Sequence, residues 1–134
     1  MAKTNLLRTI LQKHESEILD AWSKDLAAAL RLDSRIGESE LREQCREFLR
    51  VLSETVQSDV GLDVSAPAWH PATSLLGRIA ANRAERGYTP TQTATFTFSL
   101  KRPLIDRLRV AAGNDAAVLA DEVWVTTQLL DALG

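Results

Sequence analysis

The stretch RAERGYTPTQTATFTFSLKRPL, residues 83–104, decides the fold expected of this chain. Within it, Gly87 can adopt the left-handed backbone conformation that ends a helix. Thr89 then stands at an N-cap position, with Pro90 at the first helical position and Gln92 at the third, which is the pattern of a capping box. The stretch therefore predicts the end of one helix and the start of another within a single turn of chain.

Pro103 lies further along the same stretch, inside the second of these two helices. Proline lacks a backbone N–H and its ring clashes with the carbonyl group of the preceding turn, so we expect a kink there. The run TATFTFSL, residues 93–100, also shows the alternation and β-branched residues that are typical of a strand. Because the capping box comes directly before this run, we predict a helix.

Outside this stretch, apolar residues recur at steps of three and four, the spacing of amphipathic helices. We expect helices over residues 5–32, 39–56, 75–86, 90–110 and 116–133. Residues 59–71 contain Gly61, Pro67 and Pro71 and are predicted to form a loop, which Trp69 anchors to the core. The predicted fold is all-α: a single five-helix bundle over residues 1–134, with a kinked fourth helix.

The length, charge and composition of the chain exclude several classes of protein. A chain of 134 residues suffices for one domain with a single core. The net charge of −2 and the pI of about 5.7 argue against a general affinity for nucleic acid or for an anionic membrane. No apolar run is long enough to span a bilayer, and no signal peptide is recognisable. The lone cysteine, Cys45, fits a reducing compartment, so we expect a cytoplasmic protein.

Two histidines, His14 and His70, are the candidates for a haem or metal ligand. His14 lies three residues before Glu17 on a predicted helix, and His70 lies between Trp69 and Pro71 in the predicted loop. A zinc site needs three or four ligands, more than the sequence brings together here, so no metal site is expected. The favoured interpretation is an exposed helix histidine and a loop histidine packed on an aromatic ring.

The sequence offers no positive sign of an enzyme. It contains no phosphate-binding loop, nucleophile elbow, paired-carboxylate motif or cysteine–histidine cluster. Cys45 lies on an apolar stripe and is interpreted as a small buried hydrophobe, although Arg42 and Arg46 nearby leave a reactive thiol as the alternative. The third and fourth helices are basic, which indicates either a solvated face or a site for an anion or an acidic partner. Their basic residues are Arg78, Arg83, Arg86, Lys101, Arg102, Arg107 and Arg109.

The order of these features resembles the N-terminal domain of the RsbRD-type co-antagonist proteins. The likeness spans nearly the whole chain: a long amphipathic first helix, then ELREQCREFLRVL, then SLLGRIAANRAERGYTPTQTATFTFSLKRPL. Only residues 83–104 are specific, where the family shows a similar Arg-x-x-Gly-aromatic-x-Pro followed by Thr, Ala, Phe and a Leu-Lys pair. The matching residues are Arg83, Gly87, Tyr88, Pro90, Thr95, Phe96, Leu100 and Lys101. Pro103 departs from the good helix formers expected after that pair.

The resemblance implies a non-catalytic regulatory input domain that precedes a STAS domain in stressosome-like signalling, which restrains a switch kinase of the RsbT kind. Similar helical domains can also precede other outputs of bacterial signalling proteins, such as histidine kinases. Related input domains are globin-like and dimeric; most of the best-known ones lack haem, and haem-bearing relatives exist. The last helix is still amphipathic at Leu133, so we expect the chain to be the N-terminal part of a longer protein. A natural end at Gly134 is the alternative.

A mechanism follows as a hypothesis. Two protomers pack through amphipathic helices, and a change in their packing passes along the last helix to a downstream output domain. The signal is either a partner protein or a small ligand in an apolar pocket near Trp22, Trp69, Tyr88 and Phe96. A haem- or ligand-binding globin-like sensor that uses His70 or His14 is the alternative.

Overall fold

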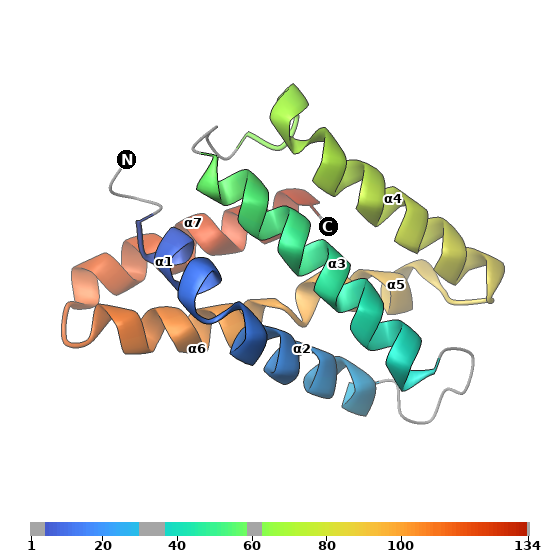
Figure 1. Cartoon of the computed structure of the whole chain (residues 1–134), viewed down its shortest axis with the longest axis horizontal. Coiled ribbons are helices and arrows are strands. Elements are labelled where there is room, and N and C mark those ends of the chain that lie inside the picture. The colour runs from blue at the N-terminus through green and yellow to red at the C-terminus, as the bar shows by residue number, and fades with distance from the viewer. Residues whose placement is uncertain (1–4, 30–36, 59–62, 134) are drawn as a thin grey trace.

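The computed structural model describes residues 5–29, 37–58 and 63–133, and in these ranges the chain is all-helical (Figure 1). The expected end of the first helix at residue 32 and the expected module boundary at Gly134 lie outside the described residues. The elements are α1 (Asn5–Lys13), α2 (Glu15–Ala29), α3 (Glu38–Gln57), the 3₁₀ helix η2 (Pro67–Trp69), α4 (His70–Glu85), α5 (Pro90–Phe98), α6 (Lys101–Ala112) and α7 (Ala116–Leu133).

The expected count of five helices is wrong, because two predicted helices are each divided. The first divides at His14, where α1 bends into α2 while the backbone hydrogen bonds from His14 N to Ile10 O (2.8 Å) and from Ile18 N to His14 O (2.9 Å) continue. Six polar residues, 12–17, separate Leu11 from Ile18 at this bend, and this gap in the apolar stripe was not interpreted as a break.

The second division, between α5 and α6, lies where Pro103 predicts a kink. Leu100 N bonds to Thr97 O (3.1 Å) in a tight turn, and Pro103 has no N–H to offer Ser99 O four residues earlier. The turn leaves Phe96 O available. The indole Nε1 of Trp22, on α2, donates to Phe96 O (3.1 Å) and to Ser99 Oγ (3.0 Å). Phe96 O also accepts a hydrogen bond from Ser99 Oγ (3.1 Å), so the tryptophan and the serine together replace the helical hydrogen bond that Leu100 N would have donated to it.

The third predicted helix begins earlier than expected. Residues 67–71 were expected to be loop, but Pro67–Trp69 form η2, and α4 starts at His70 with Pro71 in its first turn. Proline is compatible with a first turn because the N–H groups there have no helical acceptor. Trp69 is fully buried, as expected of the residue that anchors this segment. The predicted start at Pro90 and the predicted span of α7 are confirmed.

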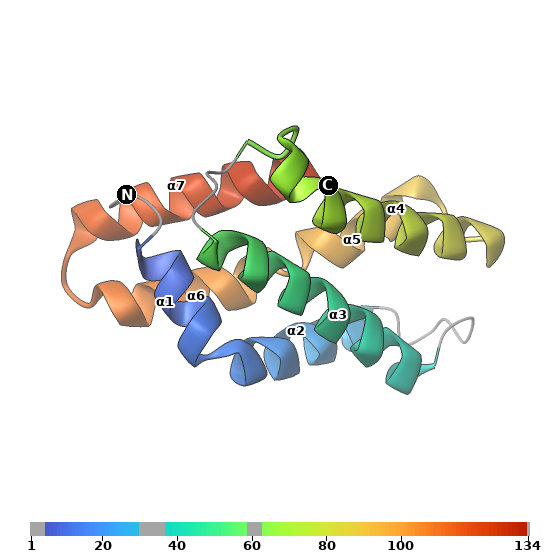
Figure 2. The ribbon, with the colours of Figure 1, turned by 45° about the horizontal axis from the view of Figure 1, so that its top comes forward.

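The helices enclose one core. α6 packs along α7 and α2 along α3, while α1 contacts α3, α6 and α7 (Figures 1 and 2). At the other end of the molecule α4 covers α3 and also contacts α5, and α5 packs against α7. An aromatic cluster of Trp22, Phe48 and Phe96 joins α2, α3 and α5, with ring centroids 4.9–6.0 Å apart. The α5–α6 junction is therefore fixed from within the core.

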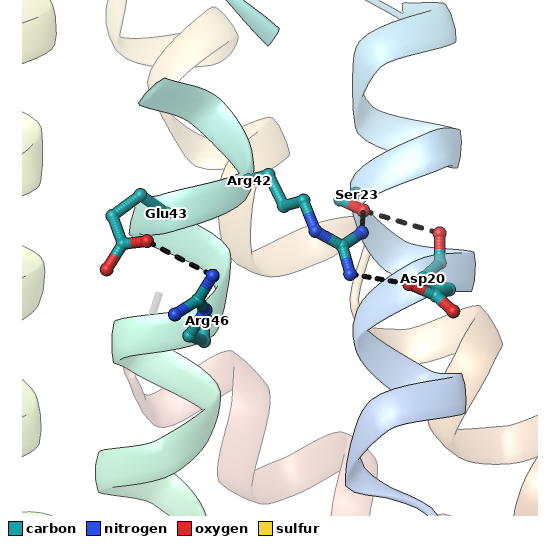
Figure 3. Close-up of polar contacts among 5 residues, drawn as sticks. All are labelled: Asp20, Ser23, Arg42, Glu43 and Arg46. Carbon is teal, nitrogen blue, oxygen red and sulfur yellow. Dashed lines mark hydrogen bonds and ion pairs between the residues drawn. The ribbon is translucent and has the colours of Figure 1, made fainter. Parts of the chain in front are cut away.

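Surface polar contacts add to the packing of α2 on α3 (Figure 3). Arg42 Nη2 lies 2.7 Å from Asp20 Oδ1, and Arg42 Nη1 donates to Ser23 Oγ at 3.2 Å. Arg46 pairs with Glu43 on its own helix. These charged side chains are largely exposed, and such pairs contribute little to stability. The association of the two helices depends mainly on the apolar cluster beneath them.

A buried carboxylate joins α7 to the start of α1. Glu122 is only 2% exposed, and its Oε1 accepts a hydrogen bond from Leu7 N (3.3 Å), a donor in the first turn of α1. Burial raises the pKa of the Glu122 carboxyl, and the hydrogen bond from Leu7 N opposes that rise only in part. Within the described helices, α1 thus receives an N-terminal capping contact from a residue far away in sequence.

We predict that Trp22→Phe lowers the free energy of unfolding by about 0.5–1.5 kcal/mol, because the buried Phe96 carbonyl loses its indole donor and keeps only the hydrogen bond from Ser99 Oγ (3.1 Å). Trp124→Phe is the matched control, since Trp124 is 64% exposed and its loss should change stability by less than about 0.5 kcal/mol. Urea unfolding followed by circular dichroism compares the two. Equal stability of the two variants would contradict the role given to Trp22.

The pKa of Glu122 predicts a pH dependence. Since the folded-state pKa is raised above its ordinary value of 4.5, ionisation of this carboxyl favours unfolding. The contribution of Glu122 to stability should therefore fall as the pH rises from 4.5 through the folded-state pKa. Glu122→Gln keeps an oxygen acceptor for Leu7 and removes this dependence, so the variant should gain stability relative to the original protein between pH 4.5 and 7.5. Parallel pH profiles in urea unfolding would refute this assignment.

Candidate functional site

The turn between α4 and α5 builds one wall of a pocket. Gly87 has a φ of 87°, Gly87 N bonds to Ala84 O (3.0 Å), and Tyr88 N bonds to Arg83 O (3.0 Å). These two hydrogen bonds are those of a Schellman motif, which needs a left-handed residue at the position of Gly87. The motif turns the chain back on itself and brings the ring of Tyr88 over the side chain of Arg83.

The pocket lies between α4, the segment 88–97 and the end of α7, and has a volume of about 560 Å³. Its walls are mostly apolar, and Figure 2 shows the end of α7 beside the first turns of α4. Size and lining are those of sites for small molecules. The lining residues are Thr73, Leu76, Gly77, Ile79, Ala80 and Ala84 from α4, Tyr88, Pro90, Thr93, Ala94, Phe96 and Thr97 from the following segment, and Leu133 from α7.

The structure brings together two of the four residues named as pocket candidates. Tyr88 and Phe96 line the pocket, and both are otherwise buried. Trp22 does not line it, but its ring packs against Phe96 with the centroids 4.9 Å apart. Trp69 is buried in the core before α4 and does not belong to the pocket lining. The pocket thus lies on the outer side of the aromatic cluster.

Arg83 is the feature that the sequence interpretation missed. It was grouped with the basic residues of a solvated face, but it is 0% exposed. Its Nη2 donates to Gln44 Oε1 on α3 at 2.6 Å, and its Cζ lies 5.6 Å from the ring centroid of Tyr88 and 5.3 Å from that of Phe96. Leu75, Ile79 and Arg83 are spaced four residues apart, so the apolar stripe of α4 does lead to Arg83.

The other basic residues of that group are arranged differently. Arg86 pairs with Glu40 on α3 (2.6 Å), Lys101 with Asp131 on α7 (2.5 Å), and Arg107 approaches Glu17 (4.0 Å). Lys101 Nζ also lies 4.4 Å from the ring centroid of the exposed Phe98. These cations join neighbouring helices and do not gather into one patch. The acids that pair with them lie on α2, α3 and α7.

The histidines lie away from the pocket. His14 is partly exposed, with Nδ1 3.3 Å from Glu17 Oε1, and His70 is exposed in the first turn of α4. Neither belongs to the pocket lining, and the described ranges contain no group of three or more His, Cys, Asp or Glu side chains that could hold a metal ion. Neither histidine is therefore placed to coordinate a haem iron in this pocket.

Cys45 is fully buried in the core on α3. Burial raises the pKa of its thiol to about 12, although the positive charges of Arg83 and Arg42 act in the opposite direction. The thiol is therefore neutral at physiological pH. A reactive cysteine needs a lowered pKa and access to solvent, and Cys45 has neither, so the interpretation as a small buried hydrophobe holds.

Comparison with known proteins gives the family. None of the described helices is both long and apolar enough to cross a membrane. No curated protein and no solved structure matches the chain, so the globin-like arrangement stays a prediction. The family model of the RsbT co-antagonist protein rsbRD N-terminal domain matches residues 16–134, which include the turn, the pocket and the junction described above. The chain belongs to the family of rsbRD-type N-terminal domains of RsbT co-antagonist proteins.

Proposed function

We propose that this domain is the non-catalytic sensory input of a stressosome-type regulator, and that the pocket between α4, α5 and α7 receives its signal. Membership of the family gives the regulatory class. The observation that supports the pocket as the input is its position. It joins the turn at Gly87 to Leu133, at the end of α7. A ligand there contacts the helix that would lead towards an output domain.

A series of side-chain contacts connects the pocket to α7. Phe96 lines the pocket and is held by Trp22, whose indole also contacts Ser99 at the α5–α6 junction. Past this junction, Lys101 pairs with Asp131 in the last turn of α7. A ligand that moves Phe96 would therefore act on α7 both directly, at Leu133, and through the α5–α6 junction. Only a ligand that favours one packing over the other can shift the equilibrium.

The proposed output of the signal rests on the description of the family. A co-antagonist of RsbT acts on a switch kinase of that kind, and we propose that the downstream part of this protein is a STAS domain through which α7 passes the signal. A homodimer packed through the amphipathic helices and a cytoplasmic location belong to the same proposal. The haem-binding alternative is less well supported, because neither His14 nor His70 lies at the pocket.

Gly77 allows the pocket to be filled without disturbing the core. It lines the pocket on α4, and a Cβ atom added there would meet no atom within 4 Å. We predict that Gly77→Leu, placed in the native protein, makes retention of the RsbT-type kinase insensitive to osmotic shock. The measurement is the amount of that kinase that co-purifies with the protein before and after the shock.

The matched control is Gly77→Ala, which adds a single methyl group at the same position. It should keep the response, and should raise the free energy of unfolding by about 0.5–1 kcal/mol because alanine is the better helix former. A normal response of Gly77→Leu would show that the signal does not enter through the pocket. Failure of the kinase to co-purify with the original protein would refute the stressosome-type output.

A further inference from the structure

Arg83 places a positive charge behind the pocket wall. The guanidinium group is fully buried and remains charged, since arginine does not lose its proton in proteins. The two aromatic rings that it faces, those of Tyr88 and Phe96, are also walls of the pocket. The charge therefore lies directly behind the pocket's aromatic side.

The hydrogen-bonding capacity of this group is only partly used. Nη2 donates to Gln44, whereas Nε and Nη1 have no acceptor among the described residues. Burying polar groups without partners is unfavourable, and for a charged group the cost is larger. The two rings offset part of that cost, since a cation over an aromatic face is attracted to it.

No carboxylate in the described part of the chain neutralises Arg83 by direct contact. Glu40, the nearest candidate, is engaged with both Nη atoms of Arg86 (2.9 and 2.6 Å). Cys45, also close by, carries a neutral thiol because burial raises its pKa to about 12. The pocket lining contains no acidic residue at all, only apolar side chains, three threonines and the tyrosine. The neighbourhood thus has an excess of positive charge facing an apolar pocket.

We propose that the pocket binds a monocarboxylate with an apolar body, whose carboxylate group displaces the Tyr88 ring and accepts a hydrogen bond from Nη1 of Arg83. A hydrogen bond between a guanidinium and a carboxylate, in which both groups are charged, is among the stronger polar interactions in proteins. The apolar body would lie along Leu76, Ala80 and Leu133. This inference rests on the proposed role of the pocket and adds the chemical class of its ligand.

The test compares two probes that differ only in their head group, sodium octanoate and 1-octanol, by isothermal titration calorimetry on the native protein at pH 7.5. Octanoate should bind at least about tenfold more tightly, the factor expected of one charge-assisted pairing. Arg83→Met, which keeps an unbranched apolar side chain of similar length, should abolish this preference and leave the affinity for 1-octanol unchanged. Arg78→Met is the matched control, because Arg78 lies on the same helix but is exposed, and it should keep the preference.

The results of this test bear on the chemical class of the ligand and can be distinguished from a failure of the proposed function. Equal affinity for the two probes, no binding of octanoate, or a preference that survives Arg83→Met would overturn the inference. Binding of octanoate to Gly77→Leu with unchanged affinity would place the ligand elsewhere and overturn it as well. None of these results alters the kinase measurement, in which Gly77→Leu tests whether the pocket is the input whatever ligand it binds.

Discussion

The junction between α5 and α6 depends on the hydrogen bond from the Trp22 indole to the Phe96 carbonyl. The pocket wall and the direction of α6 depend in turn on this junction. The helix predicted from Pro90 onwards is divided ahead of Pro103, and at the junction Leu100 N bonds to Thr97 O, which leaves Phe96 O to other donors. Trp22 Nε1 and Ser99 Oγ both donate to Phe96 O, and the ring of Trp22 also packs on that of Phe96. The outer side of Phe96 is thereby left as a wall of the pocket, and α6 is directed along α7.

The second constraint is the Schellman turn at Gly87, which sets Tyr88 against Arg83. The turn holds Tyr88 and the contact with Trp22 holds Phe96, so the two aromatic walls of the pocket are fixed from opposite sides. A buried guanidinium with unused donors is unfavourable for folding unless something compensates it. Buried polar groups that weaken a fold are often retained for function. Arg83 fits that description, since the neighbouring residues stabilise its charge only in part.

Much of the fold could be predicted from local signals. Gly87, Pro90 and Pro103 act on the backbone within a few residues, so the end of α4, the start of α5 and the break before α6 follow from them. The bend at His14 was missed because the polar residues 12–17 are equally compatible with an exposed turn of one continuous helix. The early start of α4 was missed because Pro67 and Pro71 are typical of a loop. Of the four residues named for a ligand pocket, Tyr88 and Phe96 line the pocket described above and Trp22 and Trp69 do not, and ligand binding there stays a prediction. Arg83 was missed because a basic residue is ordinarily assigned to the surface, even when it continues an apolar stripe.

If the pocket is the input, filling it must change the packing at the end of α7. Amide hydrogen exchange in the native protein, compared between Gly77→Leu and Gly77→Ala, tests it without a ligand, because only the larger side chain fills the pocket. We predict that the amide exchange rates of the two variants differ at residues 129–133 of α7 as well as at residues 93–97, and that they are equal in α2. A difference confined to α4 would contradict it, because the pocket would then be isolated from the helix that carries the signal.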